Sequence, residues 1–225
     1  MARKVAVDFF YDVISPYSWI GFEMLSRYQN QWKSMELKLK PFYLGGIMKG
    51  AQNKPPLVVP NKALYMTKDL KRLNQCYKIP IILPGNFVQL AMSKTVINPM
   101  RFITAIDMLT NGKSTENISR QLWKRIFNLH KDVTSKDSLR EAGDEAQLDS
   151  DVINKAIEIM ESPEVKDRLK QVTDEALNHG AFGAPTTVIH LPSGPEMIWG
   201  SDRIELIGTL LGEKYVGPLE QYSKL

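Results

Sequence analysis

Two strand-like segments stand near the start of this chain with a helix-like segment between them, and this order restricts the fold more than any other feature. Val5–Tyr11 is rich in β-branched and aromatic residues, and residues 35–44 alternate apolar with polar side chains. Residues 17–28 are apolar on several sides, as in a helix packed against a sheet and a second layer. Strand, helix and strand form a βαβ unit.

A helical pattern then runs from about residue 60 to residue 180, after a Gly- and Pro-containing segment, 45–56, that we expect to be a loop. Asn98-Pro99 and Ser162-Pro163 each have the pattern of an N-cap followed by proline in the first turn. We expect seven helices here, at 61–76, 86–95, 99–111, 115–130, 136–144, 149–161 and 163–178.

Strand character returns after residue 183. Residues 184–191 and 196–200 flank a Pro- and Gly-containing turn, which predicts a hairpin. A last helix should start within 201–205, where Asp202 and Glu205 have the spacing of a capping box. The chain thus reads βαβ, a helical insertion, then ββα. We expect an α/β fold whose first domain combines 1–60 with 180–225, and an inserted helical domain over 61–179.

The junction between the first strand and the first helix contains Ser15-Pro16-Tyr17-Ser18. Ser is a preferred N-cap and Pro suits the first helical position, so Ser15 can be explained as a cap alone. The free N–H groups at a helix start also favour an anion. Ser15 could then donate a hydrogen bond to an anion held there, such as a thiolate.

Composition excludes several classes of function. Charged residues are 24% and apolar residues 43%, which is ordinary for a soluble domain, and no apolar run is long enough to span a membrane. The net charge of +4 is scattered, and its densest cluster, Lys68, Lys71 and Arg72, includes Asp69; a solvated helix face explains it better than a nucleic-acid site.

The single cysteine, Cys76, rules out an intramolecular disulfide and a Cys-rich zinc site, and indicates a reducing compartment or one without disulfide machinery. The three histidines have no metal-binding spacing, so we expect no metal.

The sequence ends in Ser223-Lys224-Leu225. A terminal Ser-Lys-Leu is the address read by the peroxisomal import receptor. Residues 220–222 read as a free tail that would leave this address exposed. We therefore expect a peroxisomal location.

The layout resembles the thioredoxin fold with a helical domain inserted, as in the DsbA-like disulfide oxidoreductases. In that fold the site lies at the start of the first helix and faces a cis-proline ahead of the third strand. Ser15 to Ser18 occupy the place of the redox Cys-x-x-Cys, and Pro185 occupies the place of the cis-proline. Without cysteines at 15 and 18, exchange through a protein dithiol is excluded.

Four segments together resemble the kappa-class glutathione transferases: 10–19, 53–56, 180–185 and 200–203. The resemblance covers essentially the whole chain and implies a homodimer that uses glutathione as co-substrate, with no other cofactor. It implies a thiolate transferred to a small hydrophobic electrophile or used to reduce a peroxide. The facing wall would come from apolar side chains of the helical insertion, which do not identify the natural electrophile.

The resemblance also implies the role of each site residue. Ser15 would hydrogen-bond the glutathione sulfur, next to Pro16 and Tyr17. Ala184, before Pro185, would pair with the cysteinyl part through its backbone. The remaining contacts fall on Asn53 and Lys62 for the glycine end, and on Ser201, Asp202 and Arg203 for the γ-glutamyl end. Three of these residues have a simpler explanation: Asp202 as a cap, Asn53 as a loop former and Lys62 as a surface charge.

Asp69 would reach the γ-glutamyl ammonium bound to the neighbouring subunit. The alternative is that it is solvated beside Lys68 and Arg72 on its own helix. Two other functions stay open for the whole protein: a glutathione-dependent isomerase of the 2-hydroxychromene-2-carboxylate type, which shares this fold and a serine here, and a non-catalytic glutathione-binding protein.

Overall fold

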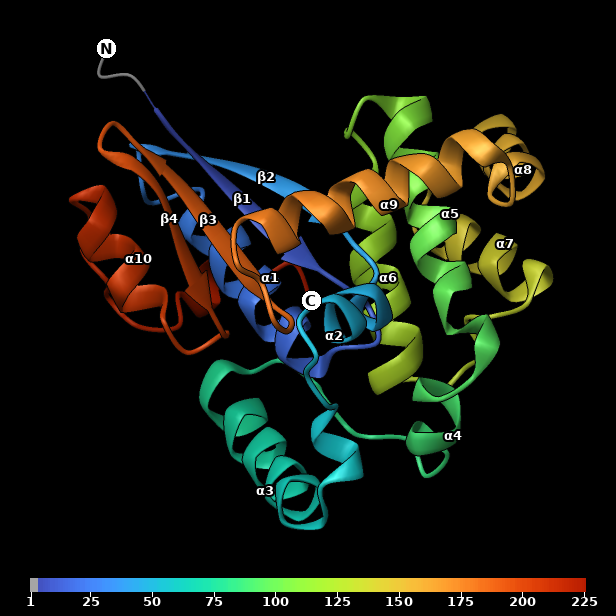
Figure 1. Ribbon diagram of the computed structural model, residues 1–225, viewed down its shortest axis with the longest axis horizontal. Coiled ribbons are helices and arrows are strands. Elements are labelled where there is room, and N and C mark those ends of the chain that lie inside the picture. The colour runs from blue at the N-terminus through green and yellow to red at the C-terminus, as the bar shows by residue number, and fades with distance from the viewer. Residues whose placement is uncertain (1–3) are drawn as a thin grey trace.

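The computed structural model describes residues 4–225 and shows a four-stranded mixed sheet with helices on both faces (Figure 1). The strands are β1 (Val5–Tyr11), β2 (Met35–Pro41), β3 (Thr186–Leu191) and β4 (Gly194–Trp199), in the order β2-β1-β3-β4. β1 pairs parallel with β2, with Val5 opposite Met35, and antiparallel with β3, which pairs antiparallel with β4. The predicted βαβ and ββα halves therefore join in one sheet.

The helices are α1 (Pro16–Tyr28), α2 (Leu44–Gly50), α3 (Pro60–Tyr77), α4 (Phe87–Ala91), α5 (Asn98–Thr110), α6 (Thr115–Phe127), α7 (Lys136–Glu145), α8 (Ser150–Ile159), α9 (Pro163–Asn178) and α10 (Ile204–Leu211). Short 3-10 turns lie at Pro56–Val58, Lys94–Ile97 and Glu220–Tyr222. Helices were correctly predicted in all seven places, but the helix expected at 86–95 ends at Ala91, and a separate 3-10 turn begins at Lys94.

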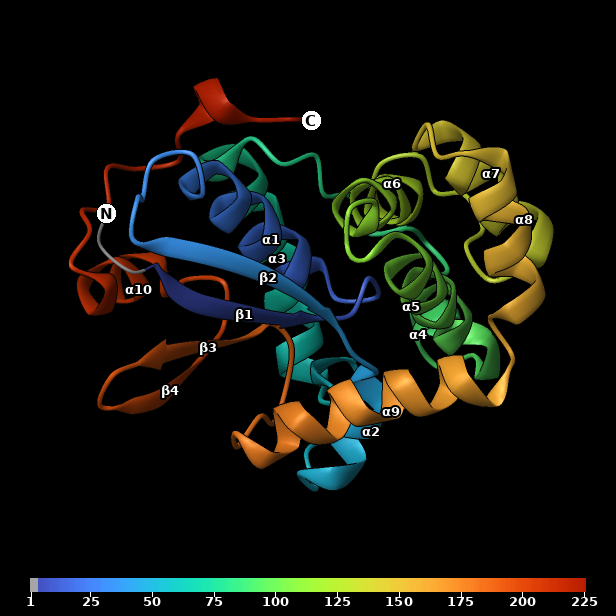
Figure 2. The same ribbon diagram turned by 90° about the horizontal axis from the view of Figure 1, so that it is seen from above.

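The two faces of β1 support two apolar layers, because side chains alternate along a strand. Phe9 and Tyr11 pack with α1, whereas Phe10 packs with Phe42 and with residues of α2 and α9. Figure 2 shows α1 above β1 and β2, and α9 with α2 below them. This arrangement places the start of α1 at one end of the sheet, where β1 ends.

The inserted helices pack directly on α1. Phe22 of α1 and Trp123 of α6 have ring centroids 4.8 Å apart. Arg120 of α6 donates from Nε to Glu23 at 2.8 Å, and both side chains are buried. The main apolar cluster is continuous from the sheet into these helices. The division at residues 60 and 180 stays a prediction.

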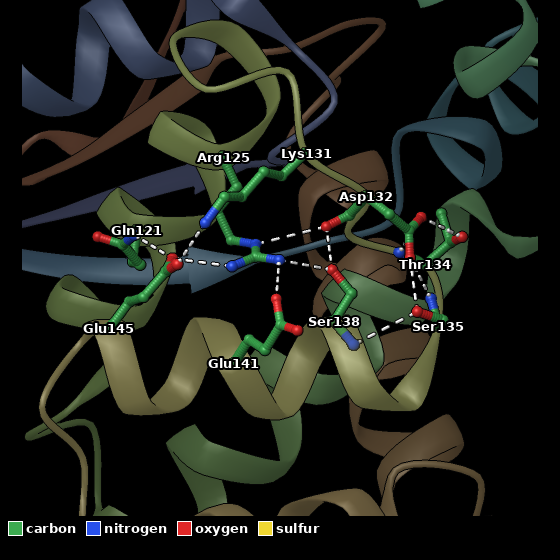
Figure 3. A network of polar contacts seen from close by, with 9 residues as sticks. All are labelled: Gln121, Arg125, Lys131, Asp132, Thr134, Ser135, Ser138, Glu141 and Glu145. Atoms are coloured by element: carbon green, nitrogen blue, oxygen red, sulfur yellow. Dashed lines mark hydrogen bonds and ion pairs between the residues drawn. The ribbon is translucent and has the colours of Figure 1, made fainter.

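A polar network joins α6 to α7 (Figure 3). The guanidinium of Arg125 is buried and contacts Glu141 and Glu145 at 2.9 Å each. It also donates to Ser138, whose hydroxyl donates to the carbonyl of Asp132. Because burial desolvates the guanidinium while its carboxylate partners compensate, the pKa of Arg125 stays above its ordinary value.

Three local predictions are wrong. The segment expected as a loop at 45–56 contains the helix α2. The last helix begins only at Ile204, and its cap residue, Arg203, makes no side-chain cap bond, so the capping box of Asp202 and Glu205 does not form. Glu220–Tyr222 is a 3-10 turn, and not a free tail.

The segment after α10 is tied to the body of the protein. The buried guanidinium of Arg27 donates to the carbonyl of Pro218 at 2.9 Å and to the hydroxyl of Ser223 at 3.3 Å. Lys224 donates to Glu116 at 2.7 Å. Residues 220–225 are exposed although they make these contacts.

Candidate active site

Ser15 lies where β1 leads into α1, as the sequence predicts. Its backbone is extended, and its Oγ accepts the N–H of Ser18 at 3.1 Å, so it is the N-cap of α1. Pro16 takes the first helical position. The Ser15 side chain is almost buried, at 6% exposure of the residue. Ser15 therefore caps α1, and because its oxygen accepts in the cap bond, its hydroxyl proton remains available to another acceptor.

The turn ahead of β3 faces this helix start. The peptide bond between Ala184 and Pro185 is cis, as expected. The Ser15 hydroxyl donates to the Ala184 carbonyl over 3.5 Å, which is long for a hydrogen bond between two oxygens. A serine hydroxyl has one proton and two lone pairs. It can keep its cap bond and redirect the proton to a nearby anion.

Asn53 reaches the same turn from the segment after α2. Its Nδ2 donates to the carbonyl of Phe182 at 2.7 Å, two residues before Ala184. Lys62 lies exposed in the first turn of α3. The structure thus brings Asn53 to the turn that contains Ala184, and it leaves the Lys62 ammonium in solvent.

Tyr17 and Asp69 meet across α1 and α3. The Tyr17 hydroxyl donates to Asp69 Oδ2 at 2.8 Å, and the Tyr65 hydroxyl donates to Oδ1 at 3.3 Å. Burial, and then this hydrogen bond, raise the pKa of Tyr17. Tyr17 therefore stays protonated as a donor. Asp69 therefore accepts hydrogen bonds from its own chain and is not simply solvated.

The fourth segment of the predicted site, residues 200–203, follows β4. Gly200 N–H donates to the Pro185 carbonyl at 3.0 Å, which places Ser201 next to the cis-proline turn. Ser201 is buried, whereas Asp202 and Arg203 are exposed and lie 3.7 Å apart as an ion pair. The N–H groups here belong to a turn before α10, and not to the first turn of the helix as predicted.

An exposed aromatic pair adjoins the turn. Phe182 and Trp199 have ring centroids 5.1 Å apart, and they are 39% and 46% exposed. A Cβ at Gly183 would lie 2.7 Å from Trp199 Nε1, so glycine lets the indole approach the backbone beside Ala184. The turn therefore has an apolar surface on one side.

Among residues 4–225, no three His, Cys, Asp or Glu side chains gather as metal ligands would. Over the same residues, no helix combines the length and apolar character needed to cross a membrane.

Comparison with known proteins supplies the family. Residues 6–212 match the family described as the DSBA-like thioredoxin domain. The human protein named glutathione S-transferase kappa 1 is 43% identical over 213 residues, which cover 95% of this chain and 93% of the human one. This chain belongs to the kappa-class glutathione S-transferases. It carries the DsbA-like thioredoxin fold of that class.

Members of a neighbouring class are more distant from this kappa-class chain. The 2-hydroxychromene-2-carboxylate isomerase of Pseudomonas sp. (strain C18) is 24% identical over 220 residues, covering 92% of this chain and 91% of the isomerase. A solved isomerase of the same name superposes with a TM-score of 0.72 at 20% identity, covering 92% of this chain and 94% of its own. At that identity the structural likeness shows the shared fold.

Asp12 is a feature of the site that the sequence analysis did not single out. It is 1% exposed, and both of its carboxylate oxygens accept backbone N–H groups. The sequence signal that could have identified Asp12 is its position as an acidic residue between apolar neighbours, three positions before Ser15. Its partner Leu44 could not be identified, because residue 44 was expected to end a strand and the segment after it to be a loop, whereas Leu44 begins α2.

Proposed function

We propose that this protein binds glutathione at the start of α1 and transfers its thiolate to small apolar electrophiles. The observation that supports this most is the Ser15 hydroxyl, which caps α1 and directs its proton toward the turn containing Ala184. The helix start adds a positive partial charge to the same place. The 43% identity to a human kappa-class transferase supports the same chemistry.

Bond energies limit what Ser15 can contribute. A cysteine thiol with a pKa of about 8.5 is roughly 7% ionised at pH 7.4. A hydrogen bond to a charged group is worth about 1.5–3 kcal/mol and a helix start about 0.3–1 kcal/mol, which together can lower the pKa by roughly two units. Thiolate then rises about twelvefold, but nucleophilicity falls roughly eightfold. Placing the electrophile must therefore supply most of the rate.

The rest of the tripeptide would lie along the three segments that meet at the turn. The Ala184 backbone suits an extended cysteinyl residue. The Ser201 and Asp202 turn suits the γ-glutamyl end, where the Asp202 carboxylate can accept from an ammonium and Arg203 adds a positive charge. Asn53 and the Lys62 ammonium suit the glycine carboxylate. In this arrangement Pro16 and Tyr17 lie beside the sulfur.

Transfer to electrophiles is the leading activity, with peroxide reduction at the same thiolate as a further one. The Phe182 and Trp199 surface favours an apolar electrophile. The isomerase and a non-catalytic binder are the alternatives. We expect the purified protein to turn over chlorodinitrobenzene with glutathione and to leave a hydroxychromene carboxylic acid unchanged. Turnover of the hydroxychromene alone would favour the isomerase, and binding of glutathione without any turnover would favour the binder.

We further propose a homodimer in which Asp69 contacts glutathione bound to the partner. Tyr17 and Tyr65 each donate one hydrogen bond to Asp69, and a carboxylate has about four acceptor positions. Acceptor positions therefore remain for an ammonium. A two-fold interface would give each site one such carboxylate.

We also propose import into peroxisomes through Ser223-Lys224-Leu225, which are exposed. Deleting these three residues should leave activity intact and move an N-terminal fluorescent fusion out of peroxisomes. The Glu116→Ala variant keeps the address and removes its ion pair with Lys224, so it serves as the control. Peroxisomal fluorescence without the tripeptide would contradict this location.

A further inference from the structure

Asp12 makes a set of backbone contacts that join two segments of the site. Its Oδ1 accepts the N–H of Ile14 at 3.0 Å, and its carbonyl accepts the N–H of Ser15 at 3.0 Å. Its Oδ2 accepts the N–H of Leu44, the first residue of α2, at 2.9 Å. One buried side chain thus connects the turn that presents Ser15 with the start of another helix.

α2 leads in turn to Asn53. The N–H of Asn53 donates to the Met48 carbonyl at 2.9 Å, and its side-chain amide donates to Phe182 at 2.7 Å. The Asp12 carboxylate therefore links the segment assigned to the sulfur with the segment assigned to the glycine end. Within residues 4–225, no other side-chain hydrogen bond joins the β1–α1 turn to residues 44–53.

We propose that Asp12 is a positioning residue, which holds the Ser15 hydroxyl at the glutathione sulfur by clamping the β1–α1 turn to the start of α2. This inference rests on the proposed function. Asp12 does not touch the sulfur in this account, and it acts only through the place of Ser15.

The carboxylate suits this role better than any other side chain of its size. Both partners are N–H donors, so both terminal atoms must accept, and each oxygen of a carboxyl group keeps a lone pair whether or not the group is protonated. An asparagine would turn its NH₂ group toward one of the two donors and lose that bond. A buried N–H left without a partner is costly, which makes the clamp sensitive to this one atom.

The charged and titrating groups around Asp12 are few. Tyr11 precedes it on β1, and Tyr43 lies just ahead of α2. Arg101 of α5 lines a surface pocket together with Tyr43. No cation pairs with Asp12 among the contacts of residues 4–225, so hydrogen bonds to backbone N–H groups are what hold it.

Two substitutions break the clamp from opposite sides. Asp12→Asn removes one acceptor together with the charge. Leu44→Pro removes the N–H that Oδ2 accepts and leaves Asp12 itself unchanged, although it also replaces an apolar side chain that packs on both clusters. The backbone suits it, because proline is tolerated at the first position of a helix and Tyr43 before it is already extended. A misfolded Asp12→Asn protein would leave Leu44→Pro as the test.

A matched control lies on the same strand. Asp8 is also buried, at 5% exposure, and its Oδ2 bonds His190 at 2.9 Å, away from the turn at Ser15. Asp8→Asn should change stability without changing the thiol. The experiment measures thiolate absorbance of bound glutathione against pH, and transfer to chlorodinitrobenzene at pH 6.5, in each variant.

We expect both clamp variants to raise the pKa of the bound thiol by up to about two units and to lower the rate at pH 6.5 by up to about sixfold, because a roughly fiftyfold loss of thiolate is offset by a roughly eightfold gain in nucleophilicity. Asp8→Asn should do neither. In a Ser15→Ala background, the clamp variants should cause no further change in either quantity. Equal changes with and without the Ser15 hydroxyl, or no change with it, would overturn the positioning role. Failure of the wild type to bind glutathione would instead reject the proposed function.

Discussion

Asp12 and Ser15 show how one short turn combines a cap and an unusual acid. The cap could be predicted, because Ser before Pro at a strand-to-helix junction is a local signal. The environment of Asp12 could not, because its desolvation depends on layers contributed by β1, α2 and α5. Burial raises the pKa of this carboxyl to about 7, although bonds from Ile14 and Leu44 oppose the shift.

This raised pKa predicts how stability depends on pH. The folded protein binds the Asp12 proton more tightly than the unfolded chain, whose pKa is about 3.9. The stability that protonation contributes is complete below about pH 4 and is lost as the pH rises to about 7, at up to 1.4 kcal/mol per pH unit. Asp12→Asn lacks this titration.

Urea unfolding of the wild type and of Asp12→Asn at pH 4.5, 5.5, 6.5 and 7.5 checks this prediction. The difference in unfolding free energy, wild type minus variant, should fall steadily over that series. A difference that is flat or rises with pH would mean that Asp12 is ionised throughout.

At the scale of helices, the predictions failed where packing between distant segments outweighs local preference. Three glycines make α2 a poor helix by propensity. Yet a Cβ at Gly50 would meet Leu177 at 2.7 Å and one at Gly46 would meet Thr173 at 3.0 Å, so glycine allows α2 to lie closely on α9. Tertiary contact forms this helix, and a single sequence does not display that contact.

The start of α10 failed for a different reason. Gly200 has a φ of +102°, and a Cβ there would lie 2.6 Å from Asp202 Oδ1. The Asp202 side chain thus lies back over the preceding turn, and does not cap the helix. The spacing of Asp202 and Glu205 is compatible with a capping box, but the left-handed backbone at Gly200 turns the chain so that the box does not form.

The α6–α7 network supplies a prediction about stability. Arg125→Met should lower the unfolding free energy by roughly 2–3 kcal/mol, because the buried guanidinium holds Glu141, Glu145 and Ser138. Lys155→Met, which removes an exposed pair with Glu158, is the control and should change stability by less than about 1 kcal/mol. Urea unfolding measures both, and equal effects would show that the network adds little.

For the molecule as a whole, the order of elements predicted the fold, since the βαβ and ββα halves could pair in one sheet across the insertion. The four separated segments of the candidate site were chosen through their resemblance to one family, and the assignment of their residues to glutathione stays a prediction. What could not be predicted is that Asp69 accepts from Tyr17 in its own chain. That contact depends on how α3 packs on α1, which no local pattern records.

The proposed cross-subunit contact makes a prediction at this scale. Asp69→Asn should raise the KM for glutathione about tenfold while sedimentation still shows a dimer, since a charge-assisted bond to the ammonium is lost. Tyr17→Phe removes the bond within the chain and keeps the carboxylate, so it should change KM less. A monomeric wild type, or equal changes in both variants, would refute the shared site.

The central claim is that the Ser15 hydroxyl stabilises the thiolate of bound glutathione. Thiolate absorbance titrated against pH in the wild type and in Ser15→Ala tests it directly. We predict that Ser15→Ala still binds glutathione, raises the pKa of the bound thiol by about one to two units and lowers turnover. An unchanged pKa in a folded variant that binds glutathione would contradict the account and leave Ser15 as the cap of α1 alone.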